Sequence, residues 1–122
     1  MLLGKRGEDV AESFLEGLGH NILTRNYRTG HLEIDIISTD ANGVHFVEVK
    51  SRVAPVAVAP EENVTPLKQR KIANAALRYL HGSKDPGVSA DSDVHFDIVA
   101  VTFDGGDEIV EWFPDAYIPI YV

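Results

Sequence analysis

Two short segments of the chain carry charged side chains at alternate positions. The segment LEIDIIS contains Glu33 and Asp35, and the segment VHFVEVKS contains Glu48 and Lys50. Side chains alternate between the two faces of a β-strand, so each pair shares one face of its strand. The residues DANG between the segments favour a tight turn, which predicts a β-hairpin with Asp35 opposite Glu48. The pattern therefore predicts two carboxylates and a lysine at one place in a sheet.

Acids arranged in this way require a cation. Apolar residues on the opposite face place both strands well inside the domain, where neighbouring carboxylates repel each other and lose hydration. A hard, oxygen-binding ion such as Mg²⁺ or Mn²⁺ compensates this cost. The metal would lower the pKa of a bound water while Lys50 orients it or neutralises a phosphate, which suits phosphodiester hydrolysis. We therefore expect Asp35 and Glu48 to be metal ligands and Lys50 to be catalytic.

The two expected helices have clear signals. Apolar residues near helical spacing predict an amphipathic helix over residues 2–18. Its apolar face is expected to contain Leu3, Val10, Phe14 and Leu18, with Ala11 and Leu15 beside them. Thr65 and Pro66 offer an N-cap and a first residue for a second helix that ends at Gly82. The buried face of that helix is expected to consist of Ile72, Ala73, Ala76, Leu77 and Leu80.

The remaining segments complete the expected sheet. Residues 21–27 form a short β-prone run, and residues 94–103 are apolar enough on both faces for a central strand that turns into residues 108–113. Residues 53–63 predict a surface loop, and residues 114–122 an irregular edge. The order helix, three strands, helix, two strands predicts an α/β sandwich with a mixed sheet.

Composition limits the class of protein. A length of 122 residues predicts one compact domain spanning residues 1–122. No stretch approaches the ~20 apolar residues that span a bilayer, so we expect no membrane association and take the cytoplasm as the default compartment. The net charge of -8 argues against a nucleic-acid partner, but all 11 Lys and Arg residues lie between Lys5 and Lys84, and 9 acids lie in the last 38 residues. A locally basic face is therefore still open.

Four motifs carry a resemblance to a known family. They are Gly7-Glu8, Asn26-Tyr27-Arg28, the acid strand Ile34-Asp35-Ile36-Ile37 and the signature Phe46-Val47-Glu48-Val49-Lys50-Ser51-Arg52. With these motifs the chain resembles the YraN-like uncharacterised bacterial proteins, which are similar to archaeal Holliday junction resolvases of the PD-(D/E)XK nuclease superfamily. The family usually has Gly-Glu directly before its hydrophobic-Asp pair, whereas here Leu32 stands in the place of the glycine.

The resemblance implies a restriction-endonuclease-like three-layer sandwich, with a central mixed β-sheet flanked by helices. It implies that Glu8 joins Asp35 and Glu48 as a metal-binding and catalytic acid, and that Lys50 is the catalytic lysine. The residues we expect to contact nucleic acid are Arg52, Lys68, Gln69 and Lys71. Resolvases act as symmetric dimers, so the resemblance also makes a homodimer one expected assembly.

Several of these residues have simpler alternative roles. We expect Glu33 to pair with Arg52 or Lys50 across the hairpin, and Glu8 could equally serve only the dipole of its helix. The five histidines lack the short repeated spacing of a zinc site, so we expect them at the surface or the sheet edge, with only His31 close to the acid strand. A structural role is expected for Asp97 on the fourth strand.

Three functions are compatible with this pattern. The first is a Mg²⁺- or Mn²⁺-dependent endodeoxyribonuclease, which by analogy with resolvases acts on branched or structured DNA. The second is a non-catalytic nucleic-acid-binding or assembly module that retains the nuclease fold. The third is an interaction protein that binds a basic partner through its acidic C-terminal region. The presence of Asp35, Glu48 and Lys50 together favours the nuclease.

Overall fold

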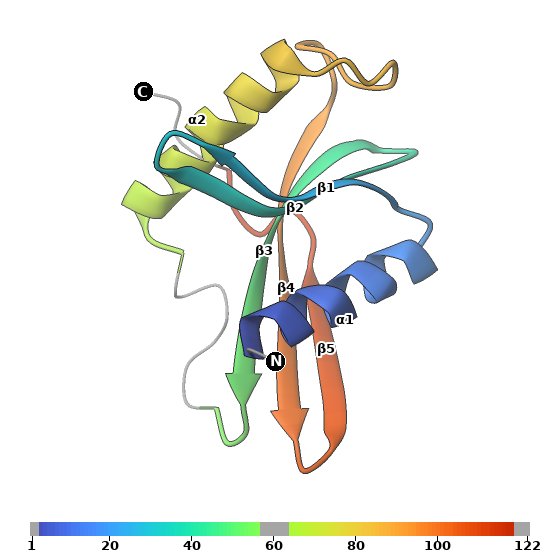
Figure 1. Cartoon of the computed structure of the whole chain (residues 1–122), viewed down its shortest axis with the longest axis vertical. Coiled ribbons are helices and arrows are strands. Elements are labelled where there is room, and N and C mark those ends of the chain that lie inside the picture. Colours follow the sequence, from blue (N-terminus) through green and yellow to red (C-terminus); the bar gives the residue numbers. More distant parts are fainter. Residues whose placement is uncertain (1–2, 57–63, 119–122) are drawn as a thin grey trace.

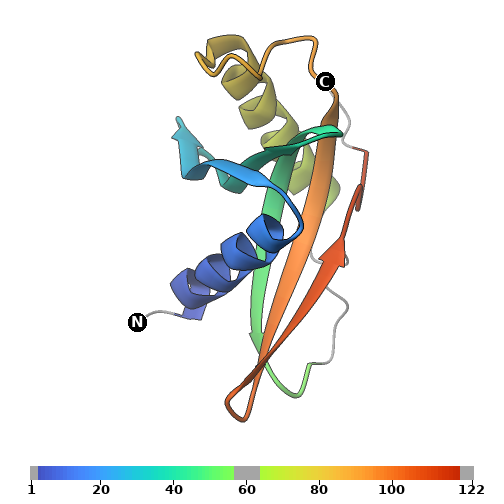
Figure 2. The same cartoon turned by 90° about the vertical axis from the view of Figure 1, so that its right-hand side faces the viewer.

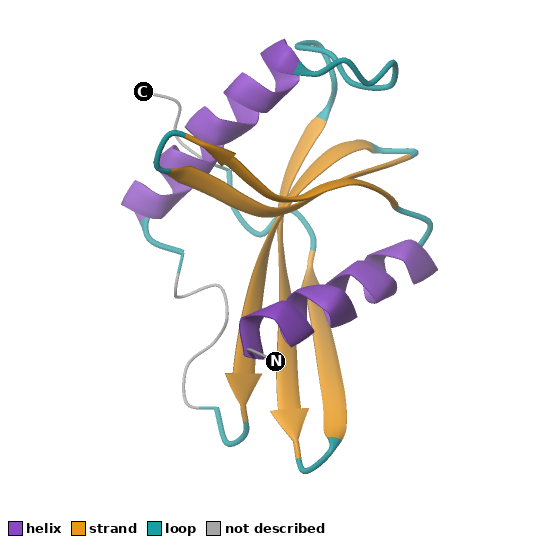
Figure 3. Ribbon diagram, in the orientation of Figure 1, coloured by secondary structure: helices purple, strands orange, loops and turns teal. Residues whose placement is uncertain are grey.

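The computed structural model describes residues 3–56 and 64–118. The elements follow in the order α1 (Leu3–Gly17), β1 (Asn21–Thr29), β2 (Leu32–Asp40), β3 (Gly43–Val53), α2 (Pro66–Gly82), β4 (Val94–Asp104) and β5 (Asp107–Phe113). The strands form one sheet in the order β1-β2-β3-β4-β5 (Figure 3). Only the β3–β4 pair is parallel, so the predicted mixed sheet is confirmed, with α2 in the crossover between its parallel strands.

The helices cover opposite faces of the sheet. Ala11 and Leu15 of α1 pack in one core cluster with Val47 of β3 and Val99 of β4. A second cluster contains residues of α2 and the opposite strand face, among them Ile72, Ala76, Leu80, Phe46 and Ile98. In Figure 1, α1 crosses in front of β3, β4 and β5 while α2 runs behind the β1–β2 hairpin, and the turned view of Figure 2 shows α1 standing off one face of the long strands. This confirms the three-layer α/β sandwich.

The predicted apolar face of α1 is buried at its centre, where Ala11 and Leu15 belong to the core and Val10 and Phe14 pack against it, but not at its ends. Leu3 and Leu18 are 38% and 47% exposed, whereas Gly7, Ala11 and Leu15 are buried. The small residues allow the helix backbone to approach the sheet closely. A Cβ added at Gly7 would lie 1.7 Å from the Ser51 side-chain oxygen of β3. Close backbone packing therefore sets the orientation of α1 and the position of the residue that follows, Glu8.

Helix α2 begins where the sequence predicts. The hydroxyl of Thr65 accepts a hydrogen bond from the backbone N–H of Lys68 at 3.2 Å, and Pro66 opens the helix. The predicted buried face is correct except that Leu77 is 38% exposed and Ala75 is buried in its place.

The predicted loop lies partly outside the described residues, at 57–63, as does the end of the predicted edge at 119–122. No helix in the described part of the chain is long and apolar enough to cross a membrane.

Strands β2 and β3 pair over only part of their length. The antiparallel register runs from Asp40↔Gly43 to Ile36↔Val47. The earlier half of β2 pairs with β1 alone, and the later half of β3 continues beside β4 as far as Val53↔Phe103. Figure 1 shows the β1–β2 hairpin turning away from the lower half of β3. A wedge therefore opens between two neighbouring strands, and the candidate site lies at its apex.

Candidate functional site

Asp35 and Glu48 lie one residue beyond the last β2–β3 pair, at the point where the strands separate. The Asp35 carboxylate accepts a hydrogen bond of 2.8 Å from the backbone N–H of Val49 on β3. Glu48 is 8% exposed. The hairpin register thus brings together the two acids that the sequence predicts, and it holds Asp35 against β3 although its strand has left the pairing.

The two acids influence each other through their charges. Burial and, to a smaller extent, the neighbouring Glu48 charge raise the pKa of Asp35 to about 7, against the opposing effect of the Val49 N–H. The charges of Glu8 and Glu33 make smaller contributions in the same direction. A carboxyl with such a pKa binds a proton or a cation readily near neutral pH, because either one removes an unfavourable buried charge.

Glu8 lies near the two strand acids but is held by a different partner. Its carboxylate accepts a hydrogen bond of 3.2 Å from Arg25 of β1, which also donates a 2.6 Å bond to Asp9. The ligand oxygens of Glu8, Asp35 and Glu48 do not all lie within 4.8 Å of one another, the spacing at which three groups share an ion. Asp35 and Glu48 are therefore the primary candidate ligands. Glu8 lies near enough for its charge to raise the pKa of Asp35.

Two lysines face the Glu48 carboxylate. The Lys50 ammonium is 3.5 Å from a Glu48 oxygen, and the Lys68 ammonium donates a hydrogen bond of 2.5 Å to the same atom. Burial lowers the pKa of Lys68, but its hydrogen bond to Glu48 and the Glu48 charge outweigh that effect and leave this pKa raised. Lys50 lies beside Glu48, as the sequence predicts, and Lys68 lies closer to Glu48 than Lys50 does.

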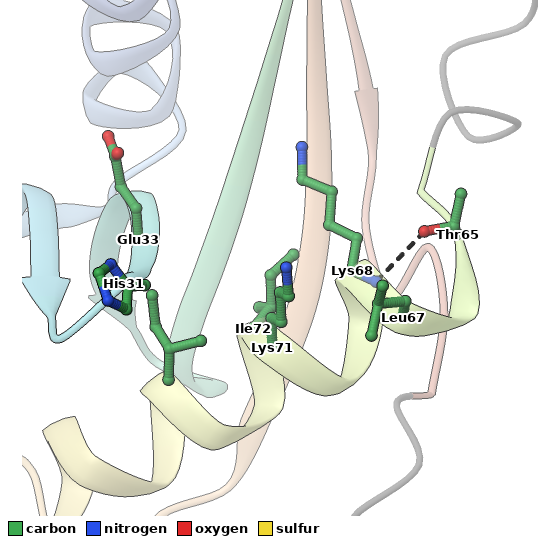
Figure 4. Close-up of a pocket in the computed structure, with 8 residues that line it drawn as sticks. His31, Glu33, Thr65, Leu67, Lys68, Lys71 and Ile72 are labelled. Atoms are coloured by element: carbon green, nitrogen blue, oxygen red, sulfur yellow. Dashed lines mark hydrogen bonds between the residues drawn. The ribbon is translucent and has the colours of Figure 1, made fainter.

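The other residues expected to contact nucleic acid differ in their surroundings and partners. Lys71 lines a hollow of about 330 Å³ between the β1–β2 hairpin and the start of α2, together with His31, Leu32, Glu33, Thr65, Leu67, Lys68 and Ile72. Figure 4 shows Lys68 extending from α2 beside the strands and Glu33 on the opposite, hairpin side of the hollow. Gln69 instead donates to the Val64 carbonyl at 3.1 Å, and an Arg52 nitrogen lies 3.7 Å from Glu111 of β5.

A second hollow lies on the other side of Glu33. It has a volume of about 660 Å³ and is lined by Gly4, Lys5, Glu8, Arg25, Asn26, Arg28 and Glu33. Its cations come from the start of α1 and from β1, whereas those of the first hollow come from α2. Positive side chains therefore flank the acid cluster on two sides, although the chain as a whole is acidic.

The predicted partner of Glu33 is wrong. Its carboxylate lies 3.4 Å from Arg28 of β1, whereas Lys50 pairs with Glu48 and Arg52 approaches Glu111. The reason is the early separation of the strands. At Glu33, β2 no longer pairs with β3, and Arg28 is its direct neighbour in the β1–β2 register.

The prediction of surface histidines is also wrong for two of the five. His20 and His45 are 5% and 3% exposed, and their rings lie 4.5 Å apart. His45 bonds Asp97, which is fully buried and has the structural role expected of it. These three residues come from three separate segments, so their spacing along the chain carries no signal. The register of the β2–β3 hairpin is the one clue, because it places His45 opposite Ser38, two residues before Asp40.

The fold and the site together define the class of protein. A mixed sheet covered by one helix on each face, with acids of two diverging strands beside a lysine, is an α/β three-layer sandwich of the nuclease-like kind. The chain belongs to the uncharacterised protein family UPF0102, whose sequence model matches residues 7–101. The expected family is thereby confirmed, and the matched range contains every residue of the acid cluster.

Relatives of this family resemble nearly the whole chain. A UPF0102 protein of Anaeromyxobacter dehalogenans is 40% identical over 117 residues, covering 94% of this chain and 83% of its own length. A UPF0102 protein of Desulfosudis oleivorans is 45% identical, with 93% of this chain and 88% of its own length covered. For one of Geobacter metallireducens the identity is 37%, with coverage of 94% and 91%.

Proposed function

We propose that this protein is a Mg²⁺- or Mn²⁺-dependent endonuclease that hydrolyses phosphodiester bonds of DNA. The observation that carries the proposal is the pair Asp35 and Glu48, two acids largely withdrawn from water beside each other at the apex of the strand wedge. Two neighbouring carboxylates that are both ionised and poorly hydrated repel each other, and Mg²⁺ and Mn²⁺ prefer oxygen ligands. The donor set therefore fits the ion that the proposed chemistry requires.

Each residue of the cluster has a place in the proposed reaction. Asp35 and Glu48 would hold the ion, which when bound activates water and stabilises charge on the phosphate. Lys50, 3.5 Å from Glu48, would orient the attacking water or neutralise the scissile phosphate. Glu8, held by Arg25, would add negative charge from the side of α1.

The cations of the two hollows support a nucleic-acid substrate. Lys68 and Lys71 lie on one side of the acids, and Lys5 and Arg28 lie on the other. A backbone laid across the wedge would meet positive side chains before and after the scissile bond, which is how phosphate contacts position a duplex. We place this activity on branched or structured DNA in the cytoplasm, with a homodimer as the assembly that would bind two strands symmetrically.

The test combines metal binding with cleavage. The purified chain is titrated with Mn²⁺ by calorimetry and then incubated with labelled linear, nicked and four-way-junction DNA, with and without Mn²⁺. Asp35→Asn and Glu48→Gln are expected to weaken metal binding. Lys50→Ala is expected to keep it and to slow cleavage by about a hundredfold or more. Glu33→Gln, whose partner is Arg28, serves as the matched control and should leave both properties near those of the unaltered chain.

One observation favours a second candidate, a non-catalytic nucleic-acid-binding module. Lys50 and Lys68 both lie against Glu48, so two ammonium groups already neutralise one of the acids without any metal. This module would bind DNA and would neither bind Mn²⁺ at Asp35 nor cleave any of the three substrates. Normal cleavage by Lys50→Ala would contradict the proposed nuclease mechanism in a different way, because it would show that cleavage does not require Lys50.

A further inference from the structure

A second polar cluster lies near the β2–β3 turn. His20 directly precedes β1, Asp40 ends β2 and His45 is near the start of β3. Each residue offers one ligand atom, and these three atoms lie within 4.8 Å of one another. Nε2 of His45 is 2.8 Å from one oxygen of Asp40, and Nε2 of His20 is 3.4 Å from the other. Two imidazole nitrogens and a carboxylate thus face a common point.

The second nitrogen of each ring is held by an outer partner. Nδ1 of His45 lies 2.7 Å from a carboxylate oxygen of Asp97, and Nδ1 of His20 lies 2.9 Å from the hydroxyl of Ser38. Histidines that bind metals in proteins commonly bond their other nitrogen to a carboxylate or another outer acceptor, which fixes the ring and its tautomer. Because both rings and Asp97 are buried, the two Nε2 atoms are oriented before any ligand arrives.

We propose that His20, Asp40 and His45 bind a Zn²⁺ ion. Bond lengths of about 2.0–2.2 Å in a tetrahedral site place neighbouring ligand atoms about 3.3 Å apart. Nε2 of His45 and Nε2 of His20 lie at comparable distances, 2.8 and 3.4 Å, from the two different oxygens of Asp40. Imidazole nitrogen with one carboxylate suits Zn²⁺ better than Mg²⁺, which prefers a full set of oxygens. The side chain of Asp40 is 17% exposed, so solvent reaches its carboxylate, and in the proposed site a water would complete the coordination of the ion.

The charges around the cluster match a divalent ion. Asp40 and Asp97 approach the His45 ring from its two nitrogens, so two carboxylates meet at one ring. A divalent ion beside Asp40 would compensate this negative charge. The stacked ring of His95, 4.6 Å from His45, closes one side of the cluster and forms its own bond of 2.7 Å to Asp115.

This site is separate from the acid cluster on the wedge. His45 and Glu48 are three residues apart on β3 and therefore project from opposite faces of the strand. A bound ion would join the start of β1, the end of β2 and the start of β3, with Asp97 connecting it to β4. It would stiffen the hairpin from which Asp35 and Glu48 project, without being a ligand of the substrate.

The test uses the full chain after removal of metals by a chelator. Calorimetric titration with ZnCl₂ should show a site of one ion per chain besides the ion bound at Asp35 and Glu48, and Co²⁺ at this site should give the intense visible absorption of a four-coordinate site with nitrogen and oxygen ligands. Asp40→Asn and His20→Gln should abolish or strongly weaken binding, whereas Ser38→Ala, which removes only the outer partner of His20, should weaken it about 10–100-fold. His31→Gln is the matched control and should bind Zn²⁺ as the unaltered chain does.

Three results would overturn the proposal. They are no Zn²⁺ binding by the metal-free chain, Zn²⁺ binding that Asp40→Asn and His20→Gln leave unchanged, and a Co²⁺ spectrum typical of six oxygen ligands. Circular dichroism shows whether each variant folds. Where His20→Gln does not fold, Asp40→Asn decides, because it conserves the size of the side chain, and the Co²⁺ spectrum of the unaltered chain requires no variant.

Discussion

The Lys68 ammonium lies 2.5 Å from a carboxylate oxygen of Glu48, although the two residues are 20 positions apart and belong to different layers. The relationship depends on the start of α2, where the Thr65 cap fixes the first turn and directs Lys68 toward β3. Under the proposed function, this ammonium compensates in the metal-free state an acid that would also bind the ion. Lys68 and a divalent ion would therefore compete for Glu48, and a bound phosphate would draw the ammonium away from it.

Lys68→Met should reveal this competition. With the ammonium removed, Mn²⁺ affinity should rise about fivefold, the lower end of a typical coupling between two sites, while DNA affinity falls. Calorimetry and fluorescence anisotropy measure the two effects. Lys71→Met is the matched control, because Lys71 lies on the same helix in the same hollow and should lower DNA affinity without changing Mn²⁺ affinity. Equal Mn²⁺ affinity in both variants would remove the basis for competition.

Asp35 should make the metal-free chain less stable as pH rises. Its folded-state pKa of about 7 lies above the unfolded value of 3.8, so the folded chain holds this proton more tightly. The free energy of unfolding is therefore largest below pH 4, decreases between about pH 4 and pH 7, and then levels off, with a total change of about 4 kcal/mol at most from this group.

Asp35→Asn should remove that dependence and stabilise the metal-free chain at pH 8 by an amount on the order of 2 kcal/mol. Urea unfolding in the presence of EDTA at pH 5 and pH 8 measures it. Glu33→Gln, an exposed acid of the same strand, should keep the decrease. In the unaltered chain Mn²⁺ should restore stability at pH 8, and the Asn variant should gain little from it. A variant that is less stable than the unaltered chain at pH 8 would contradict the burial argument.

Local signals in the sequence predict most of the fold and the centre of the candidate site. Alternating polar and apolar residues predict β2 and β3, the DANG turn sets their register, and that register alone places Asp35 beside Glu48. The Thr65-Pro66 start of α2 follows from capping chemistry in the same way. In each case the determining interactions span only a few residues, so a single sequence contains them.

The errors come from interactions between distant segments. The hairpin pattern predicts continued pairing of β2 with β3, but the strands separate, and Glu33 therefore meets Arg28. Hydrophobicity alone places Leu3 and Leu18 on the buried face of α1 and misses Gly7, whose contact with β3 brings the helix close to the sheet. The buried contact between His45 and Asp97 depends on the parallel β3–β4 pairing, which no turn in the sequence indicates.

Gly7→Ala should destabilise the chain through the contact with β3. The new Cβ would lie 1.7 Å from the Ser51 oxygen and 2.9 Å from its Cβ, so α1 must shift, at a cost of about 1–3 kcal/mol. Gly4→Ala is the matched control in the same helix, because a Cβ there meets nothing within 4 Å, and it should be neutral or stabilise by up to about 1 kcal/mol.

A double variant separates this clash from a general effect on the helix. Gly7→Ala combined with Ser51→Gly removes both atoms that the new Cβ meets, so part of the lost stability should return. Thermal unfolding of the four chains completes the cycle. If the two substitutions are additive, the contact between α1 and β3 is not what requires a glycine, and the position of Glu8 must be set by other packing.

The salt dependence of DNA binding should distinguish the two ends of α2. Lys71 lines the hollow beside the acid cluster, whereas Lys84 lies beyond the last residue of the helix, Gly82. Each phosphate contact releases counterions, so loss of one cation that touches the backbone reduces the slope of log affinity against log salt by about 0.9. Lys71→Met should show this reduction and Lys84→Met should not, measured by anisotropy without divalent ions so that no cleavage occurs. The same slope for both variants would mean that the acidic chain binds DNA through general charge and not across the wedge that holds Asp35 and Glu48.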